Sequence, residues 1–221
     1  MKDQGQVMVF DVDGTLVDSN DAHALAWVET LRQFGIKAEV RVVRRLIGMG
    51  GDKLLPTVTG IAADSDRGKQ IAKQRSAYFR QTYMERIRPF AGTRALFTAL
   101  RNRDVRLAVA SSSDEDDLAR LLDIAEVADL IERRASADDA ERSKPDPDII
   151  HAALARLGKV DREKVSMVGD TPYDVEAARK AGVRPIAFRC GGWSGLELTG
   201  AVLTFDGPAD MLARLDLALI S

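Results

Sequence analysis

Short apolar runs alternate with amphipathic segments along most of the chain, and this alternation restricts the possible folds more than any other feature. The runs are nearly continuous in apolar residues, which is typical of strands that helices cover on both faces. Parallel strands need helical crossovers, and these crossovers lie on the faces of the sheet. We therefore expect an α/β fold with a Rossmann-like parallel sheet sandwiched by helices. The expected strands are 7–10, 106–110, 130–133, 165–168, 185–188 and 202–205.

Helical patterns occupy the intervals between most of these runs. Their apolar residues recur every three to four positions, which places them on one face of a helix. Gly158 and Gly182 follow two of the patterns, at the position where a glycine often ends a helix. The expected helices are 93–101, 115–122, 147–157, 173–181 and 208–219.

One interval, residues 18–87, contains no convincing strand. A helical pattern follows Ser19, a plausible N-cap, and a second pattern covers residues 66–87. We interpret 18–87 as an inserted small α-helical cap domain, and 1–17 with 88–221 as the catalytic core. The insertion follows a strand's carboxyl end, where open α/β sheets bind ligands, so it is placed to act as a lid. The apolar residues of the first pattern are Leu25, Val28, Leu31 and Phe34.

Composition and charge exclude several classes of protein. Charged residues make up 30% of the chain and the net charge is −2, so nothing indicates a nucleic-acid or membrane partner. No apolar run approaches the length of about 18 residues that a membrane span needs, and the first residues do not resemble a signal sequence. The single cysteine, Cys190, cannot form an internal disulfide, which fits a reducing compartment. We expect a cytoplasmic protein, and no sequence feature fixes its oligomeric state.

Two carboxylates, Asp11 and Asp13, follow the first expected strand in the sequence DVDGT at 11–15. Like charges at close range repel each other and lose hydration, so the pair favours a divalent cation that offsets the charge. Oxygen ligands favour a hard ion such as Mg²⁺. A simple turn would also use Asp and Gly, and this motif alone does not exclude one. A calcium loop is disfavoured because its further oxygen ligands and distal Glu are absent.

A second strand end is also acidic. Asp170 follows the strand 165–168, and Asp174 lies four residues later in the first turn of an expected helix. Residues four apart share a helix face, so both carboxylates can point into one cleft. Helix capping explains one of the two carboxylates, but it does not explain a second acidic end in the same sheet.

Two further loops carry groups that suit an anion. The serines at 111–113 follow a strand and offer hydroxyl and backbone N–H groups, although Ser113 or Asp114 would also serve as an N-cap. Lys144 lies in a loop that prolines stiffen, where it would offset the repulsion within an acidic cluster. A lone lysine is most often a solvated surface charge. Together, however, these groups would converge on one sheet edge and form a site for a metal ion and a phosphoryl group.

The order of these motifs resembles the four motifs of the haloacid dehalogenase superfamily. They are DVDGT at 11–15, Ser111 after a strand, Lys144 before a proline, and GDTPYD at 169–174. With its helical insertion after the first motif, the chain resembles the phosphoglycolate phosphatase and β-phosphoglucomutase branch. The resemblance spans nearly the whole chain and indicates the superfamily, but it does not indicate the substrate.

The resemblance implies a Mg²⁺-dependent phosphatase that acts on a small-molecule phosphate ester. Asp11 would attack phosphorus and form an aspartyl-phosphate, while Asp13 would act first as general acid and then as general base. The groups that would hold Mg²⁺ are Asp11, the backbone carbonyl of Asp13, Asp170 and, through water, Asp174. The groups that would bind the phosphoryl oxygens are those of Ser111, Ser112 and Lys144.

A sugar-phosphate mutase is the first alternative. The stretch 18–27 resembles the start of the β-phosphoglucomutase cap, so His23 could assist Asp13, or it could simply pack near the domain hinge. The cap loop at 48–53 would select the substrate. Gly51 there replaces the arginine that grips a distal phosphate in the mutase, and Asp114 replaces a basic residue, which favours hydrolysis. The candidate cap residues are His23, Gly48, Gly51 and Lys53.

Two other classes of protein fit these residues less well. A non-catalytic ligand-binding module could use the same fold, because a fold does not determine function. A dehalogenase of the family needs only the first carboxylate and no metal, so it would not be expected to keep Asp13, Asp170 and Asp174 together.

Overall fold

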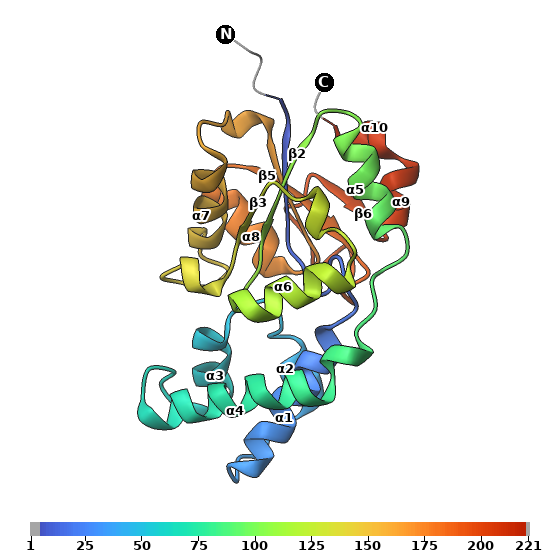
Figure 1. Ribbon diagram of the computed structural model, residues 1–221. Helices are drawn as coiled ribbons and strands as arrows, with labels where there is room; N and C mark the ends of the chain where they lie inside the picture. The colour runs from blue at the N-terminus through green and yellow to red at the C-terminus, as the bar shows by residue number, and fades with distance from the viewer. Residues whose placement is uncertain (1–4, 220–221) are drawn as a thin grey trace.

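The computed structural model describes residues 5–219 and contains a six-stranded parallel sheet in the order β3-β2-β1-β4-β5-β6 (Figure 1). The chain passes from β1 to β2 and β3 on one side, and then to β4, β5 and β6 on the other. The neighbours β1 and β4 therefore form a topological switch point, the place where open α/β sheets bind ligands. The predicted α/β fold is confirmed. The strands are β1 Val7–Phe10, β2 Arg106–Ala110, β3 Arg133–Ala135, β4 Val165–Gly169, β5 Arg184–Phe188 and β6 Leu203–Phe205.

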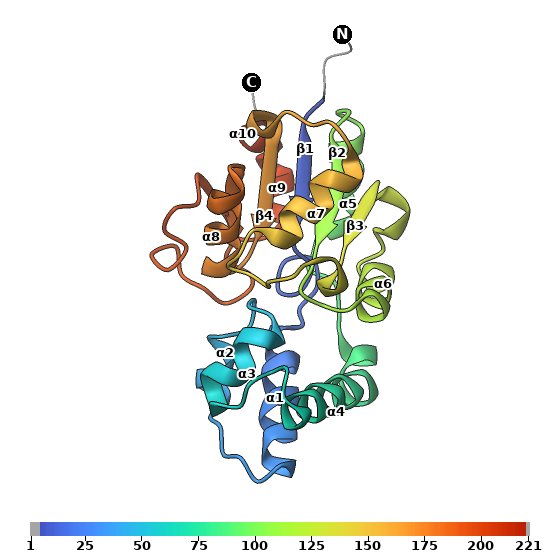
Figure 2. The same cartoon turned by 90° about the vertical axis from the view of Figure 1, so that its left-hand side faces the viewer.

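Helices cover both faces of this sheet, as Figures 1 and 2 show. Side chains alternate along β1, so that Met8 and Phe10 belong to one hydrophobic cluster and Val7 and Val9 to another. The first cluster includes residues of α5, α6, α9 and α10, and the second includes residues of α7 and α8. Full burial of a side chain as large as that of Phe10 stabilises the fold by about 1.5–3 kcal/mol. These helices are α5 Thr93–Arg101, α6 Glu115–Ile124, α7 Asp148–Leu157, α8 Pro172–Ala181, α9 Pro208–Ala213 and α10 Leu215–Ala218.

The four helices of the insertion, here called the cap, lie beyond the carboxyl edge of the sheet (Figure 2). They share a hydrophobic cluster of their own, which includes Trp27, Leu31 and Ile71. The insertion is helical as predicted, and the domain bounds at 18 and 87 stay a prediction. The cap helices are α1 Asn20–Gln33, α2 Val40–Arg44, α3 Gly51–Thr59 and α4 Asp66–Thr82.

Two chain segments connect the cap to the core, and they lie side by side. Val17 forms an antiparallel bridge with Pro89, and the backbone N–H of Asp18 donates to the carbonyl of Arg88 at 2.9 Å. The cap is thus attached through a short two-stranded connection.

Several local predictions differ from the structure. Residues Ala128–Leu130 form a 3₁₀ helix, and the strand predicted at 130–133 begins only at Arg133, where pairing with β2 starts. The helix predicted at 208–219 is interrupted at Arg214, whose backbone leaves the helical region. In α1 the buried face passes through Trp27, whereas Leu25 is 40% exposed. Within residues 5–219, no helix has the length and apolar character that crossing a membrane requires.

Candidate active site

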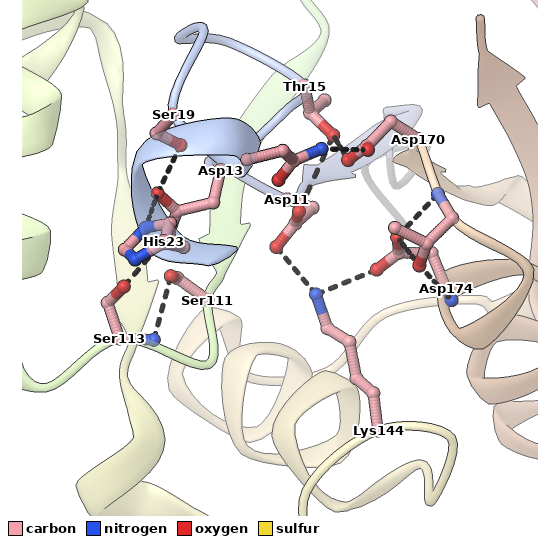
Figure 3. A network of polar contacts seen from close by, with 12 residues as sticks. Asp11, Asp13, Thr15, Ser19, His23, Ser111, Ser113, Lys144, Asp170 and Asp174 are labelled. Atoms are coloured by element: carbon pink, nitrogen blue, oxygen red, sulfur yellow. Dashed lines mark hydrogen bonds and ion pairs between the residues drawn. The ribbon is translucent and has the colours of Figure 1, made fainter. Parts of the chain in front are cut away.

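Asp11 lies directly after β1 at the switch point of the sheet, and it is buried. The ammonium of Lys144 lies between two carboxylates, 2.6 Å from Asp11 Oδ1 and 2.8 Å from Asp174 Oδ1 (Figure 3). Asp170 follows β4, the strand beside β1. Each of these three aspartates offers one oxygen within 4.8 Å of the others, so Asp11 meets Asp170 and Asp174, which lie 159 or more positions further along the chain, in one cluster.

This cluster has more negative charge than the surrounding side chains offset, because three carboxylates face the single ammonium of Lys144. Burial raises the pKa of Asp11 to about 7, although Lys144 opposes the shift and Asp174 adds to it. Burial, together with Asp174 and Asp11, also raises the pKa of Asp170 well above its ordinary value. A divalent cation would offset the remaining charge, and carboxylate oxygens suit a hard ion. The three aspartates therefore fit a metal site.

Asp174 has two functions in the structure, since each of its oxygens has a different neighbour. Its Oδ2 accepts hydrogen bonds from the backbone N–H of Thr171 at 3.0 Å and from the Thr171 hydroxyl at 2.6 Å. These contacts form a capping box at the start of α8. Its Oδ1 faces Lys144. The capping and the site interpretations of Asp174 are thus compatible.

Asp170 is held by two uncharged donors that the sequence analysis did not identify. The Thr15 hydroxyl donates to Oδ1 at 2.8 Å, and the Asn20 amide donates to Oδ2 at 2.8 Å. Thr15 belongs to the DVDGT motif, where only its neighbours carry charge. Asn20 looked like an ordinary residue at the start of a helix. Neither has a feature in the sequence that points to Asp170.

Asp13 points away from this cluster and toward the cap (Figure 3). Its Oδ1 accepts from Ser19 Oγ at 2.6 Å and contacts His23 Nε2 at 2.7 Å, and its Oδ2 accepts from Ser113 Oγ at 2.8 Å. Burial alone would raise the pKa of Asp13, but His23 and the two hydroxyls outweigh burial and hold it well below its ordinary value. Ser19 was predicted to cap α1, yet its side chain makes no capping bond because its hydroxyl is used on Asp13.

His23 is held from its other side by Arg75 of α4, which donates to Nδ1 through Nη2. A guanidinium can only donate, so Nδ1 is the acceptor, and we assign the ring hydrogen to Nε2, which donates to Asp13. The ring of His23 also stacks on Phe79, with centroids 4.0 Å apart. Arg75 could not be predicted from the sequence, because nothing distinguishes it from the other charged residues of α4.

A cleft of about 220 Å³ opens between Asp11, Asp13 and the cap. From the core, Ser112 and Ser113 line it, while the buried Ser111 supports this loop by accepting from the Ser113 backbone N–H at 3.1 Å. The cap residues in its lining are Trp27, Ile47, Gly48, Met49, Gly50, Gly51, Ala72, Arg75 and Ser76, together with His23.

Two charged candidates face other partners. Lys53 does not line this cleft, since its Nζ pairs with Asp146 Oδ2 at 2.7 Å and contacts the carbonyl of Ser143. Asp114 caps α6 as predicted, accepting from the backbone N–H of Asp117 at 2.9 Å, and it also pairs with Arg80 of the cap.

Comparison with known proteins places this site in a family. Residues 8–188 match the haloacid dehalogenase-like hydrolases. The chain belongs to this family. A phosphoglycolate phosphatase from Aquifex aeolicus is 30% identical over 218 residues, which cover 96% of this chain and 97% of the relative. The family and the class of enzyme predicted from the sequence, a phosphatase, are confirmed.

Solved structures of other proteins show the same architecture. A hydrolase from Pseudomonas syringae has a TM-score of 0.89 at 26% identity, covering 99% of this chain and 100% of that chain. A β-phosphoglucomutase from Clostridium difficile has a TM-score of 0.83 at 17% identity, covering 97% and 96%. The second likeness shows the fold alone.

Proposed function

We propose that the protein is a Mg²⁺-dependent phosphatase that hydrolyses a small phosphorylated metabolite through an aspartyl-phosphate at Asp11. One observation carries the proposal: Asp11, at the switch point, belongs to an acidic cluster with an excess of negative charge, and the separately held carboxylate of Asp13 lines the same cleft. A nucleophile and a proton-transfer group in one cleft suit phosphoryl transfer through a covalent intermediate.

Mg²⁺ suits the acidic cluster, since its three carboxylates carry more negative charge than the Lys144 ammonium offsets. It would supply positive charge beside the phosphoryl oxygens when bound. The groups that would hold it are the side chains of Asp11 and Asp170 and the backbone carbonyl of Asp13, with Asp174 acting through water.

The reaction has two steps on this chain. In the first, an Asp11 oxygen bonds to phosphorus as the ester bond breaks. Asp13 is ionised in the free protein, so it must take up a proton beside the negatively charged phosphoryl group before it gives that proton to the departing oxygen. In the second, Asp13 takes a proton from water, which attacks phosphorus and releases inorganic phosphate from Asp11. Lys144 favours the ionised nucleophile, and Ser111, Ser112 and Lys144 would bind the phosphoryl oxygens.

The cleft indicates a small leaving group. Trp27 and Met49 narrow it from the cap, and Arg75 brings a cation to the same wall. A carboxylate on the leaving group would find a favourable charge there. Since the Aquifex aeolicus relative is a phosphoglycolate phosphatase, 2-phosphoglycolate is the first ester to test. The free thiol of Cys190 suits a reducing compartment, and we propose the cytoplasm as the location.

The test is phosphate release from a panel of metabolite phosphates and from an aryl phosphate, with MgCl₂ or with chelator. We expect hydrolysis only with Mg²⁺, and a loss of about 10⁴-fold or more in Asp11→Asn. The matched control is Asp123→Asn, an exposed aspartate of α6. Full activity of Asp11→Asn, or of the wild type in chelator, would remove Asp11 or the metal from the mechanism.

The contact between His23 and Asp13 also suits a sugar-phosphate mutase, which must protonate and deprotonate two hydroxyl positions in turn. A mutase would convert a hexose 1-phosphate, with a trace of its bisphosphate, into the 6-phosphate faster than it releases phosphate. The pairing of Asp114 with Arg80 and the absence of a side chain at Gly51 favour hydrolysis. Faster isomerisation than hydrolysis would decide for the mutase.

A further inference from the structure

Asp170 lies against a loop that the proposed mechanism does not use. This loop follows β5 and contains Gly191, where a Cβ atom would lie 1.7 Å from Asp170 Oδ2. Only glycine permits so close an approach. The carbonyl of Gly191 accepts from Arg44 Nη2 at 2.6 Å and from Asn20 Nδ2 at 3.3 Å, and both donors come from the cap. The loop is therefore clamped between a candidate metal ligand and two cap residues.

Asn20 is the first residue of α1 and is 2% exposed. Its Nδ2 reaches two acceptors, Asp170 Oδ2 at 2.8 Å and the Gly191 carbonyl at 3.3 Å. On its other side lies Gly14, where a Cβ would come within 2.0 Å of this amide nitrogen. Gly14 thus makes room for the amide of Asn20, and Gly191 makes room for the carboxylate of Asp170.

The other end of the same side chain has no partner. Asn20 Oδ1 is buried and accepts no hydrogen bond from the described part of the chain, 5–219. A buried acceptor without a partner costs about 1–3 kcal/mol, and a smaller or apolar residue would avoid this cost. Helix capping does not explain the residue either, because the N-cap position is Ser19. The remaining reason for an asparagine at this position is its amide N–H group, which donates to Asp170.

The donor to Asp170 is uncharged, and this matters for a metal ligand. Hydrogen bonds to a ligating carboxylate fix its orientation, and their loss typically weakens metal binding. A lysine or an arginine in this place would offset the charge of Asp170 and compete with a cation. Asn20 and Thr15 orient the carboxylate while leaving its charge available.

We propose that Asn20 is a positioning residue for the metal site: it orients Asp170 and ties it, through Gly191, to the first helix of the cap. The proposal rests on the metal site proposed above. Because Asn20 belongs to the first cap helix and Asp170 to the core, docking of the α1 N-terminus and cation binding would favour each other, as coupled equilibria require.

The experiment is isothermal titration of the metal-free protein with MgCl₂, without substrate. We compare the wild type with Asn20→Ala, which removes the side chain, and with Asn20→Leu, which keeps much of its volume but cannot donate. The control is Asn102→Ala, which changes the other asparagine of the chain, an exposed residue at the end of α5. We expect both Asn20 variants to raise the Kd for Mg²⁺ by about 10- to 100-fold, and Asn102→Ala to leave it unchanged.

Wild-type affinity in Asn20→Leu would assign the residue to packing and overturn the proposal. Thermal unfolding in chelator shows whether each variant folds. If both Asn20 variants fail to fold, Arg44→Met is tested instead. It removes the other cap hydrogen bond to the Gly191 carbonyl, and Arg44 is less buried than Asn20, so its replacement disturbs folding less. An unchanged Kd in Arg44→Met would then overturn the proposal. If the wild type itself binds no Mg²⁺, the metal site of the proposed function is wrong. If the wild type binds Mg²⁺ and the variants bind it with the same Kd, only the role proposed for Asn20 is wrong.

Discussion

His23 Nε2 lies 2.7 Å from Asp13 Oδ1, and this contact joins the first helix of the cap to the carboxylate for which we propose proton transfer. The Arg75 guanidinium on Nδ1 leaves the ring hydrogen on Nε2, so that His23 is one of three donors that hold Asp13 ionised. The ionisation of Asp13 therefore depends in part on contacts with the start of the cap.

Replacing His23 by alanine should lower kcat/KM by about 10- to 100-fold, because Asp13 loses a donor and its orientation. The same change should raise the pKa of Asp13, so the limb of the pH profile that Asp13 controls should move to higher pH. Measurement of kcat/KM against pH checks both effects. The control is His151→Ala on α7, and an unshifted profile in His23→Ala would show that His23 only fills space.

Replacing Lys144 by methionine should destabilise the metal-free protein by about 3–5 kcal/mol at neutral pH, because buried carboxylates are left without their cation. The loss should shrink at about pH 5, where protonation of Asp11 and Asp170 relieves the repulsion. Urea unfolding in chelator measures both values. Lys159→Met, at an exposed position, is the control; an equal loss at both pH values would contradict the electrostatic account.

The metal-free protein should become less stable as the pH rises from about 4 to about 7. The pKa of Asp11 is about 7 in the folded chain and that of Asp170 is also raised, whereas both are ordinary in the unfolded chain. The folded state therefore binds more protons than the unfolded state in this window, so raising the pH lowers the free energy of unfolding. Asp13 has the opposite shift, so its contribution is complete above its ordinary pKa.

Thermal unfolding between about pH 5 and pH 8 measures this slope, which Asp11→Asn should reduce and Asp123→Asn should keep. Added MgCl₂ should raise the Tm more at the upper end, since protons compete with the cation for the same carboxylates. An equal gain at both ends would argue that the ion binds elsewhere.

The pair between Lys53 and Asp146 should couple the cap weakly to the loop that carries Lys144. Both side chains are partly exposed, and such pairs contribute about 0.2–1 kcal/mol. A double-mutant cycle with Lys53→Met and Asp146→Asn, followed by urea unfolding, measures the coupling energy. A value of zero would mean that the pair does not hold the cap.

The core of the site could be predicted from the sequence because its geometry follows from the sheet. Asp11 and Asp170 each end an apolar run, and the carboxyl ends of parallel strands share one edge. Neighbouring strands then bring such residues together without any knowledge of packing. The position of Ser111, directly after β2, follows by the same reasoning, whereas Lys144 lies in a loop nine residues beyond the end of β3.

The contacts between cap and core could not be predicted in this way. Asn20, Ser19 and Arg75 reach the site only through the angle at which α1 and α4 dock, and no periodicity encodes that angle. Leu25 shows the same limit within one helix: the buried face is displaced by one position from the predicted one, so that Ala24 and Trp27 are buried while Leu25 is exposed. Local spacing determines which residues share a face, while tertiary packing determines which face is buried.

The side-by-side connections at Val17 and Pro89 make the cap a removable module. The core closes the same short gap whatever the length of the insert, and each doubling of a loop costs only about 0.6 kcal/mol in closure entropy. A helical insert from a relative could therefore be grafted between the two connections without disturbing the sheet. Such a graft would have to keep the first turn of α1, because Asn20 and His23 lie in the insert but contact the core carboxylates of Asp170 and Asp13. We expect a graft that begins at the second turn of α1 to change which substrate the cleft admits while it keeps the contacts of Asn20 and His23.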